Sequence, residues 1–308
     1  MERKIQKISN SYLVSLPIEW IKTFKLGKGD KIYYDVLSSG TLLLSGQKHA
    51  KKHPQKGILY NEESFERDFF RLYLYGYDFI TIRIKNQNQA RKIHNYLEQF
   101  INVEIIEEDQ HHIEVNNYDI DTITPKKCFR RIFFLTGNMY DKLKEIFSAS
   151  DARQKERLKS ELKETDKRLS AFYFILIRDV RKHFSNWNFL KEEESLTRYM
   201  DLRMAAEKLE RIGDLIIFLS ELKKPFADKQ ATLIDEIFAF NKAAVFAFLK
   251  NDCAEADKLY KKADEWINDF EVRDDIFQYN VVEIIKYIKD ILNLTGGNVQ
   301  KTCNLLSL

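Results

Sequence analysis

The chain has 308 residues, of which 44% are hydrophobic and 31% are charged, with 10 glycines, 4 prolines and 3 cysteines. This composition excludes a disordered, a collagen-like or a disulfide-stabilised chain and fits two or three folded domains. The net charge of +3 is unevenly divided: residues 1–56 carry 11 basic against 4 acidic side chains, and residues 57–308 carry 39 against 43. The local basic excess indicates a nucleic-acid-binding appendage or, alternatively, the solvated lysines of any small domain.

Residues 1–47 are predicted to form short strands around one short helix. Alternating apolar residues at 5–8 and 12–16 predict a hairpin that turns at Ser9-Asn10-Ser11. Pro17 favours the first turn of a helix over residues 18–26, which Gly27 ends. Two further strands are predicted at 31–37 and 41–45. A unit of about 46 residues buries little surface, so we expect this one to dimerise.

Residues 48–57 are basic and have no apolar period, which predicts a linker, and residues 58–124 predict a small α/β unit. Its helices are expected at 65–74 and 89–100, and its strands at 78–84, 103–107 and 113–115. His111 and His112 fall between the last two strands. Neighbouring residues of a strand point to opposite faces, so a solvated turn is favoured over a metal site for this pair.

Residues 125–308 follow a helical period almost throughout, with Pro225 dividing them into two parts of three helices each. The apolar stripe of the first helix is Cys128, Ile132, Leu135, Met139, Leu143 and Ile146, and comparable stripes follow from Leu158 to Phe184 and from Leu202 to Leu219. After Pro225, helices are predicted at 233–250, 254–270 and 279–306. The similar lengths indicate two repeats, about 126–224 and 225–308, packed as an antiparallel bundle.

Charged residues form a second stripe on the third predicted helix. Arg203, Glu207, Glu210 and Asp214 stand at i, i+4, i+7 and i+11, so three carboxylates share one edge of the helix. Hard cations such as iron, manganese or magnesium take carboxylate oxygens, and bundle metal sites use acids at this spacing. The alternative is a solvated face with one Arg203–Glu207 ion pair.

Other chemical signals are weak. The chain has no nucleophile elbow, phosphate-binding loop, dinucleotide fingerprint or H-E-x-x-H helix, so we do not expect an enzyme. Asp179 and His183 lie one helical turn apart, and an exposed helix end is favoured over an acid–base pair there. The three cysteines, Cys128, Cys253 and Cys303, are interpreted as small core residues. With neither a membrane span nor a secretory signal in sight, a cytoplasmic location without membrane insertion is expected.

The opening of the chain resembles the AbrB/SpoVT-type swapped-hairpin domain. The resemblance rests on RKIQK at 3–7, SYLVSLPIEW at 11–20 and LGKGDK at 26–31. It implies that two chains interlace their hairpins into one small barrel that meets DNA through basic residues of the first strand and its turn. Carried over by position, the DNA-binding residues would be Arg3, Lys4, Lys7, Asn10 and Ser11.

The helical part resembles the PhoU family of phosphate-uptake regulators, which are duplicated three-helix proteins. The clearest match is LERIGD at 209–214, and residues 169–182 fit the family's second-helix pattern. The resemblance implies that Glu210 and Asp214, with Glu207 nearby, hold a divalent metal or iron. Where the second repeat should carry another acidic pair, this chain has Asn293, Gly296, Gly297 and Asn298.

Together these features predict a multidomain α+β protein with a dimeric N-terminal swapped-hairpin β-barrel, a small α/β unit and a PhoU-like all-α bundle. The order of the parts resembles archaeal-type PhoU-like transcription regulators. The predicted function is a DNA-binding homodimer whose helical body senses or relays phosphate status or a related signal. One alternative is an adaptor that binds a phosphate-transport or signalling protein and uses the hairpin domain only to dimerise. An antitoxin-like role is a weaker alternative, because antitoxins usually carry a short tail.

Overall fold

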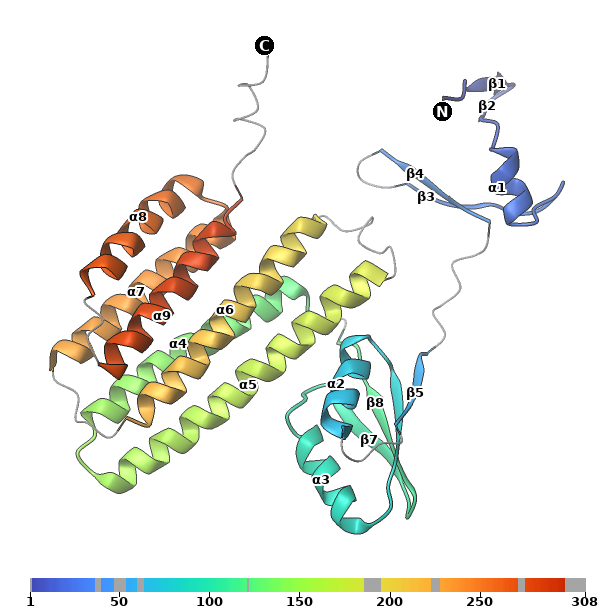
Figure 1. Cartoon of the computed structure of the whole chain (residues 1–308). Helices are drawn as coiled ribbons and strands as arrows, with labels where there is room; N and C mark the ends of the chain where they lie inside the picture. Colours follow the sequence, from blue (N-terminus) through green and yellow to red (C-terminus); the bar gives the residue numbers. More distant parts are fainter. Residues whose placement is uncertain are drawn as a thin grey trace. The chain divides into compact units, whose positions relative to one another are not determined.

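The computed structural model shows an α+β protein in which helices predominate (Figure 1). It describes residues 2–36, 40–46, 54–59, 64–120, 122–185, 195–222, 228–270 and 275–296. The chain forms two compact units, one reaching from the N-terminus to Pro54 and one beginning at Gln55. The α/β part and the helical part therefore belong to one unit, and the N-terminal part forms the other.

The N-terminal unit contains two short hairpins and one helix. Its elements are β1 (Gln6–Ile8), β2 (Ser11–Leu13), α1 (Ile18–Thr23), β3 (Tyr33–Val36) and β4 (Leu42–Ser45). In the first hairpin Ile8 pairs with Ser11 across a two-residue turn, in which Ser9 takes a φ of 56°. The second hairpin pairs β3 with β4. Among the described residues these strands form two separate sheets and do not close into a barrel within one chain.

The predicted helix over residues 18–26 is shorter than its apolar pattern suggested. The α-helix ends at Thr23, because Lys25 turns the chain with a φ of 51° before Gly27 is reached. The amide of Gly27 then donates a hydrogen bond to the carboxylate of Asp30, with 2.7 Å between Gly27 N and Asp30 Oδ2. Asp30 thus fixes the loop that follows the helix.

The α/β part is a four-stranded sheet with two helices on one face (Figure 1). Its elements are β5 (Lys56–Leu59), α2 (Phe65–Leu74), β6 (Phe79–Arg83), α3 (Gln87–Leu97), β7 (Val103–Glu108) and β8 (His112–Asn117). The strand order is β5-β6-β8-β7, in which β5 and β6 are parallel and the other pairs antiparallel. Ile80, Ile82, Ile113 and Val115 point to the buried side, where Phe69 and Ile93 of the helices cover them.

The first strand of this sheet corrects the predicted linker at 48–57, of which residues 48–53 lie outside the described residues. Lys56 and Gly57 belong to β5 and pair with Phe79 and Ile80 of β6. Gly57 is buried, and a Cβ placed on it would lie 2.8 Å from Leu72 Cδ1. The glycine is therefore needed for the close approach of α2 to the sheet and does not mark a linker.

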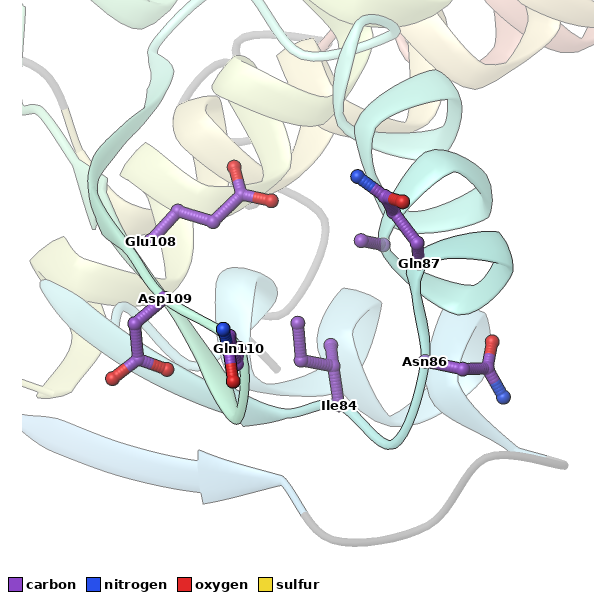
Figure 2. Close-up of a pocket in the computed structure, with 7 residues that line it drawn as sticks. Ile84, Asn86, Gln87, Glu108, Asp109 and Gln110 are labelled. Carbon is purple, nitrogen blue, oxygen red and sulfur yellow. The ribbon is translucent and has the colours of Figure 1, made fainter.

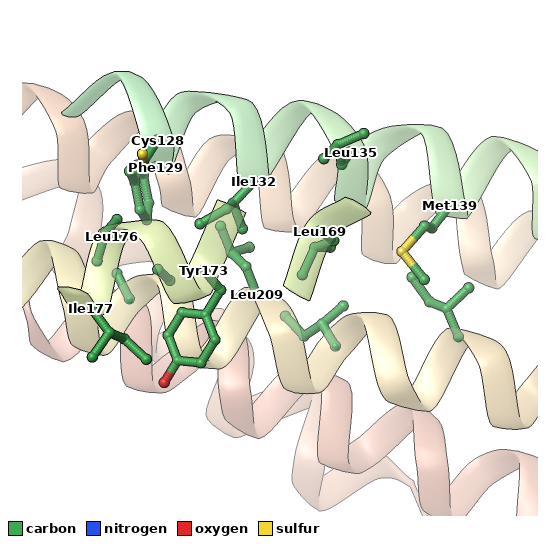
Figure 3. Packing of buried hydrophobic residues seen from close by; sticks show 14 of the residues in the cluster. Cys128, Phe129, Ile132, Leu135, Met139, Leu169, Tyr173, Leu176, Ile177 and Leu209 are labelled. Atoms are coloured by element: carbon green, nitrogen blue, oxygen red, sulfur yellow. The ribbon is translucent and has the colours of Figure 1, made fainter. Parts of the chain in front are cut away.

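The described residues of the helical part form six helices, which run alongside one another (Figure 1). They are α4 (Pro125–Ser148), α5 (Ala152–Ser185), α6 (Leu196–Ser220), α7 (Asp228–Lys250), α8 (Cys253–Asp269) and α9 (Ile276–Asn293). The predicted stripe from Cys128 to Ile146 is buried throughout, as are its counterparts on α6 from Leu202 to Leu219. Figure 3 shows side chains of α4, α5 and α6 meeting in one apolar layer.

The helix lengths differ more than the sequence suggested. The first three helices have 24, 34 and 25 residues, whereas the last three have 23, 17 and 18. The helix predicted over 279–306 begins at Ile276 and ends at Asn293, because the amide of Leu294 already bonds back to Ile291 and Leu292. Residues 297–308, including Cys303, lie outside the described residues. Cys128 is buried as expected, and Cys253 is half-buried.

The C-terminal half of α5 joins the helical part to the α/β part through Arg178, whose side chain is 2% exposed. Its Nη1 donates to the carbonyl oxygens of Tyr73 at 2.8 Å and Tyr77 at 3.1 Å, and its Nη2 donates to Asn117 O at 3.3 Å. One turn further on, Lys182 pairs with Asp78 and Asp119. Within the part of the chain that the structure describes, no helix is both long and apolar enough to cross a bilayer.

Candidate functional site

The first candidate site is the basic hairpin at the N-terminus. Lys7 lies in β1 and pairs with Tyr12 of β2, with Lys7 Nζ 5.9 Å from the centre of the Tyr12 ring. Arg3 and Lys4 precede β1, and all three cations are exposed. Asn10 lies in the turn at the other end of the hairpin. Arg3 and Asn10 lie seven positions apart in the sequence, about 23 Å of extended chain, so the predicted DNA-binding residues form a line and not a cluster.

The hairpins also expose an unusual amount of apolar surface. None of the described side chains between residues 2 and 46 is buried. Ile5 is 72% exposed, Tyr12 69%, and Val36 70%. Exposed as well are Ile8, Leu13, Val14, Ile18, Tyr34 and Leu42. Exposed apolar side chains in this number mark a contact site in soluble proteins, because water does not favour leaving them bare.

The second candidate site is a group of carboxylates between α5 and α6. Asp166 of α5 lies against Gly213 of α6: a Cβ placed on the glycine would be 3.4 Å from Asp166 Oδ1. Glu210 and Asp214 flank that glycine, and Ser170 Oγ lies 3.5 Å from Glu210 Oε1. Within the LERIGD segment, Gly213 thus leaves room for the aspartate of the neighbouring helix. We call Asp166, Glu210 and Asp214 the carboxylate cluster.

Burial and mutual repulsion shift the protonation of this cluster. Partial burial, with smaller effects from Asp214 and Asp166, raises the pKa of Glu210 to about 7. Burial and the charge of Asp214 raise the pKa of Asp166 to about 6. Asp214 lies at the exposed rim, and its pKa is raised by the part of it that is desolvated. Asp166 Oδ1 is buried without a hydrogen-bond donor among the described residues. Near neutral pH the cluster is therefore partly protonated, although the charge of Arg211 opposes the rise in pKa of Glu210 and Asp214.

Two residues change the predicted membership of this site. Glu207 stands apart, because its Oε1 accepts a hydrogen bond from Arg211 Nε at 3.3 Å. Asp166 was not predicted, although the sequence held a signal for it: it follows Leu158 and Leu162 at a spacing of four, where the apolar stripe of α5 leads one to expect another leucine. A polar residue among the apolar residues of a helix indicates a polar contact with a neighbouring helix, and this was the signal for Asp166.

The carboxylates do not form a ready-made metal centre. Over the described residues, no three His, Cys, Asp or Glu side chains converge in a way that could hold a metal ion. The unsatisfied oxygen of Asp166 suits a cation, but the group as arranged supplies too few converging donors. Cation binding at Glu207, Glu210 and Asp214 stays a prediction.

A hollow of about 460 Å³ lies in the α/β part, between the start of α3 and the β7–β8 hairpin. Figure 2 shows Glu108 and Gln87 facing each other across it, whereas Asp109 and Asn86 point away. Its acids already have partners: Glu108 Oε2 is 2.9 Å from His94 Nε2, and Asp109 Oδ1 accepts from the amides of His111 and His112. The hollow therefore shows no unsatisfied acid that would mark a ligand.

The stability of the helical part is expected to fall between pH 5.5 and 8. Carboxyl groups whose pKa is raised by folding bind protons more tightly in the folded state, so their contribution is complete at low pH and is lost above the folded pKa. Because Glu210 keeps part of its surface in water, we expect a loss of about 1 to 2 kcal/mol.

Urea denaturation at pH 5.5 and at pH 8 would measure this loss in the free energy of unfolding. The Glu210→Gln variant should show a much smaller fall, since one of the repelling charges is gone. Glu207→Gln is the matched control, because Glu207 pairs with Arg211 outside the cluster. A fall of equal size in wild type and Glu210→Gln would contradict the assignment.

Comparisons with known proteins found no relative of this chain. No protein-family model, no curated protein and no solved structure matches the chain. The resemblances to the swapped-hairpin and PhoU families therefore stay predictions that rest on the motifs themselves.

Proposed function

We propose that the protein is a DNA-binding transcription regulator that acts as a homodimer, with the N-terminal unit as its DNA-binding part and the helical part as a sensor or relay. The observation that carries the proposal is the N-terminal unit itself, which combines exposed cations with exposed apolar strands. A second copy of the same unit would bury these apolar side chains, as in the intertwined barrel of the swapped-hairpin family. Dimerisation would also double the cations offered to a duplex.

The location of the positive charge supports DNA as the partner. Residues 1–56 carry a net charge of +7, while the remainder carries −4. Arg3, Lys4 and Lys7 lie along one exposed hairpin, where they can contact phosphates and fix the register of the protein on the duplex. Polar Asn10 and Ser11 at the turn are the residues that could reach base edges.

The experiment is a fluorescence-anisotropy titration of the full-length protein against duplex DNA. Replacing Arg3, Lys4 and Lys7 by glutamine should abolish binding at physiological salt. The matched control replaces Lys22, Lys25 and Lys28 by glutamine, which removes the same charge from exposed positions outside the hairpin. If the two triple variants bound DNA with equal affinity, the binding would depend on the total positive charge of the N-terminal unit and not on the hairpin. No salt-sensitive binding by the wild-type protein would favour the adaptor alternative, in which the hairpins serve only to dimerise.

We also propose that the carboxylate cluster takes up a divalent cation as part of the sensing function, with water molecules supplying the ligands that the present arrangement of side chains does not. A comparison of α6 with α9 supports this. Adding 75 to a residue number of α6 gives the corresponding position on α9. Six buried positions of α6 then correspond to positions that are also buried on α9: 202, 205, 206, 209, 213 and 216 correspond to 277, 280, 281, 284, 288 and 291. The same step carries Asp214 onto Lys289, which pairs with Asp264 of α8. The last three helices thus place an ammonium group where the first three have a carboxylate.

Metal analysis of the purified protein tests the cation. Wild type should retain a metal that Asp166→Asn and Glu210→Gln lose, while Glu207→Gln retains it. Equal metal content in all four proteins would count against the cluster as a cation site. The DNA-binding proposal does not depend on this result.

A further inference from the structure

The sheet of the α/β part has one face that α2 and α3 do not cover. Alternation along the strands sends Ile80, Ile82, Ile113 and Val115 to the helices and the intervening residues to the other side. On that side Lys56, Ile58, Arg83, Glu104 and Glu107 are exposed, and Glu114 is half-buried. We call these six residues the outer face.

The charges of the outer face are sorted by strand. The basic residues Lys56 and Arg83 belong to β5 and β6, whereas Glu114 belongs to β8 and Glu104 and Glu107 belong to β7. The strand order β5-β6-β8-β7 therefore makes one half of the face basic and the other half acidic. In one row across the sheet, Lys56 pairs with Phe79, Phe79 with Asn116, and Asn116 with Glu104.

The outer face is unfavourable when it stands alone. Glu107 lies directly opposite Glu114 in the β7–β8 ladder, and like charges at such positions destabilise a sheet. His112 of β8 lies on the same side, with its Nε2 4.0 Å from Glu107 Oε1. Ile58 is 53% exposed, and Ile106 is 46% exposed at the irregularity between Ile105 and Glu107. Among the described residues, neither Glu104 nor Glu114 makes an ion pair. A partner that brings basic side chains to the acidic half would relieve the repulsion.

We propose that this partner is a second copy of the chain, packed with its outer face on the first about a two-fold axis parallel to the strands. Rotation about such an axis lays β5 of one copy over β7 of the other and β6 over β8, so each basic half meets an acidic half. Lys56 then faces Glu104 of the second copy, and Thr81 faces its Glu114. A two-fold axis across the strands would instead place like charges together. The aligned arrangement is also the one that paired sheets commonly adopt.

The outer face is too small to hold two copies of the chain together by itself. Four strands about 4.8 Å apart and four residues long make a surface of only a few hundred Å², below the roughly 800 Å² per partner of a stable interface. The contact therefore rests on the proposed N-terminal dimer, which holds two copies together. Ten residues separate Ser45 of β4 from Lys56 of β5, a tether of at most about 36 Å that gives a high effective concentration.

Zero-length carbodiimide cross-linking of the full chain tests the inference. Within one chain Lys56 and Glu104 lie at opposite edges of the sheet, three strand spacings or about 14 Å apart, so a direct amide between them must join two chains. Mixed unlabelled and nitrogen-15-labelled subunits should yield this cross-link in mass spectrometry. Lys92→Gln on the helix-covered side is the control and should leave it unchanged.

Charge exchange makes the test specific. Lys56→Glu alone leaves two carboxylates and Glu104→Lys alone leaves two amines, so neither can form the amide and both serve as blanks. The double variant K56E/E104K restores one amine and one carboxylate, and it should recover the cross-link to at least ten times the level of these blanks if the two positions face each other. Sedimentation velocity of the same samples reports the dimer. A dimeric wild-type chain without the cross-link would overturn this inference and leave the N-terminal dimer standing. A monomeric wild-type chain would overturn both.

Discussion

Under the proposed function, the affinity of the protein for DNA is expected to fall about a thousand-fold when monovalent salt rises from 50 to 200 mM. Three hairpin cations per chain, Arg3, Lys4 and Lys7, give six in a dimer. If each neutralises one phosphate, the logarithm of the binding constant falls with the logarithm of salt at a slope of about −5. Anisotropy titrations at four or more salt concentrations would measure this slope.

The slope separates the hairpin from the general positive charge of the N-terminal unit. Each hairpin cation removed per chain should make the slope shallower by nearly 2, because the dimer loses two phosphate contacts. Removing Lys22, Lys25 and Lys28 instead should leave the slope near its wild-type value. A wild-type affinity that changes less than about tenfold over the same range would contradict phosphate binding by the hairpin.

Local patterns in the sequence predicted the elements that local physics determines. The helix predicted over residues 65–74 has those bounds in the structure, and the buried stripe from Cys128 to Ile146 follows the helical period. The LERIGD segment pointed to Glu210 and Asp214 because acids at that spacing share a face of one helix. Each of these signals lies within a single element, so no knowledge of its neighbours was needed.

What the sequence did not reveal depends on packing between elements. Lys56 and Gly57 resemble a linker, and only their pairing with β6 makes them a strand. Asp166 joins Glu210 because α5 packs on α6 at Gly213, over 40 residues away in the chain. The burial of Arg178 was not predicted, because it follows from the docking of the α/β part. Tertiary contacts decide such positions, whatever their local pattern.

The long helix α5 connects two features that the sequence kept separate. Asp166 lies in its middle, and Arg178 follows twelve residues later, about 18 Å along the helix axis. The carboxylate cluster and the contact with the α/β part thus share one rigid element. A change of charge at the cluster that shifts α5 against α6 would also move the anchor of the α/β part.

Replacing Arg178 by alanine is expected to destabilise the protein by about 3 to 5 kcal/mol. The guanidinium donates to the carbonyls of Tyr73, Tyr77 and Asn117, and it lies 3.7 Å from Asp78 and 3.5 Å from Asp119. Alanine would take one donor from each of these carbonyls, although Tyr73 O keeps the amide of Gly76 and Tyr77 O keeps Asn117 Nδ2. It would also take one cation from Asp78 and Asp119, and each lost partner of a buried polar group carries a desolvation penalty. Urea denaturation at pH 7 measures the loss.

Arg181→Ala is the matched control for this prediction. Arg181 is exposed on the same helix and lies 5.5 Å from the Tyr75 ring, so its removal should cost less than about 1 kcal/mol. Arg178→Lys should fall between the two, because lysine keeps the charge but lacks the planar fork that reaches three carbonyls. Equal stabilities of the two alanine variants would mean that the α/β part does not depend on Arg178 for its attachment to α5.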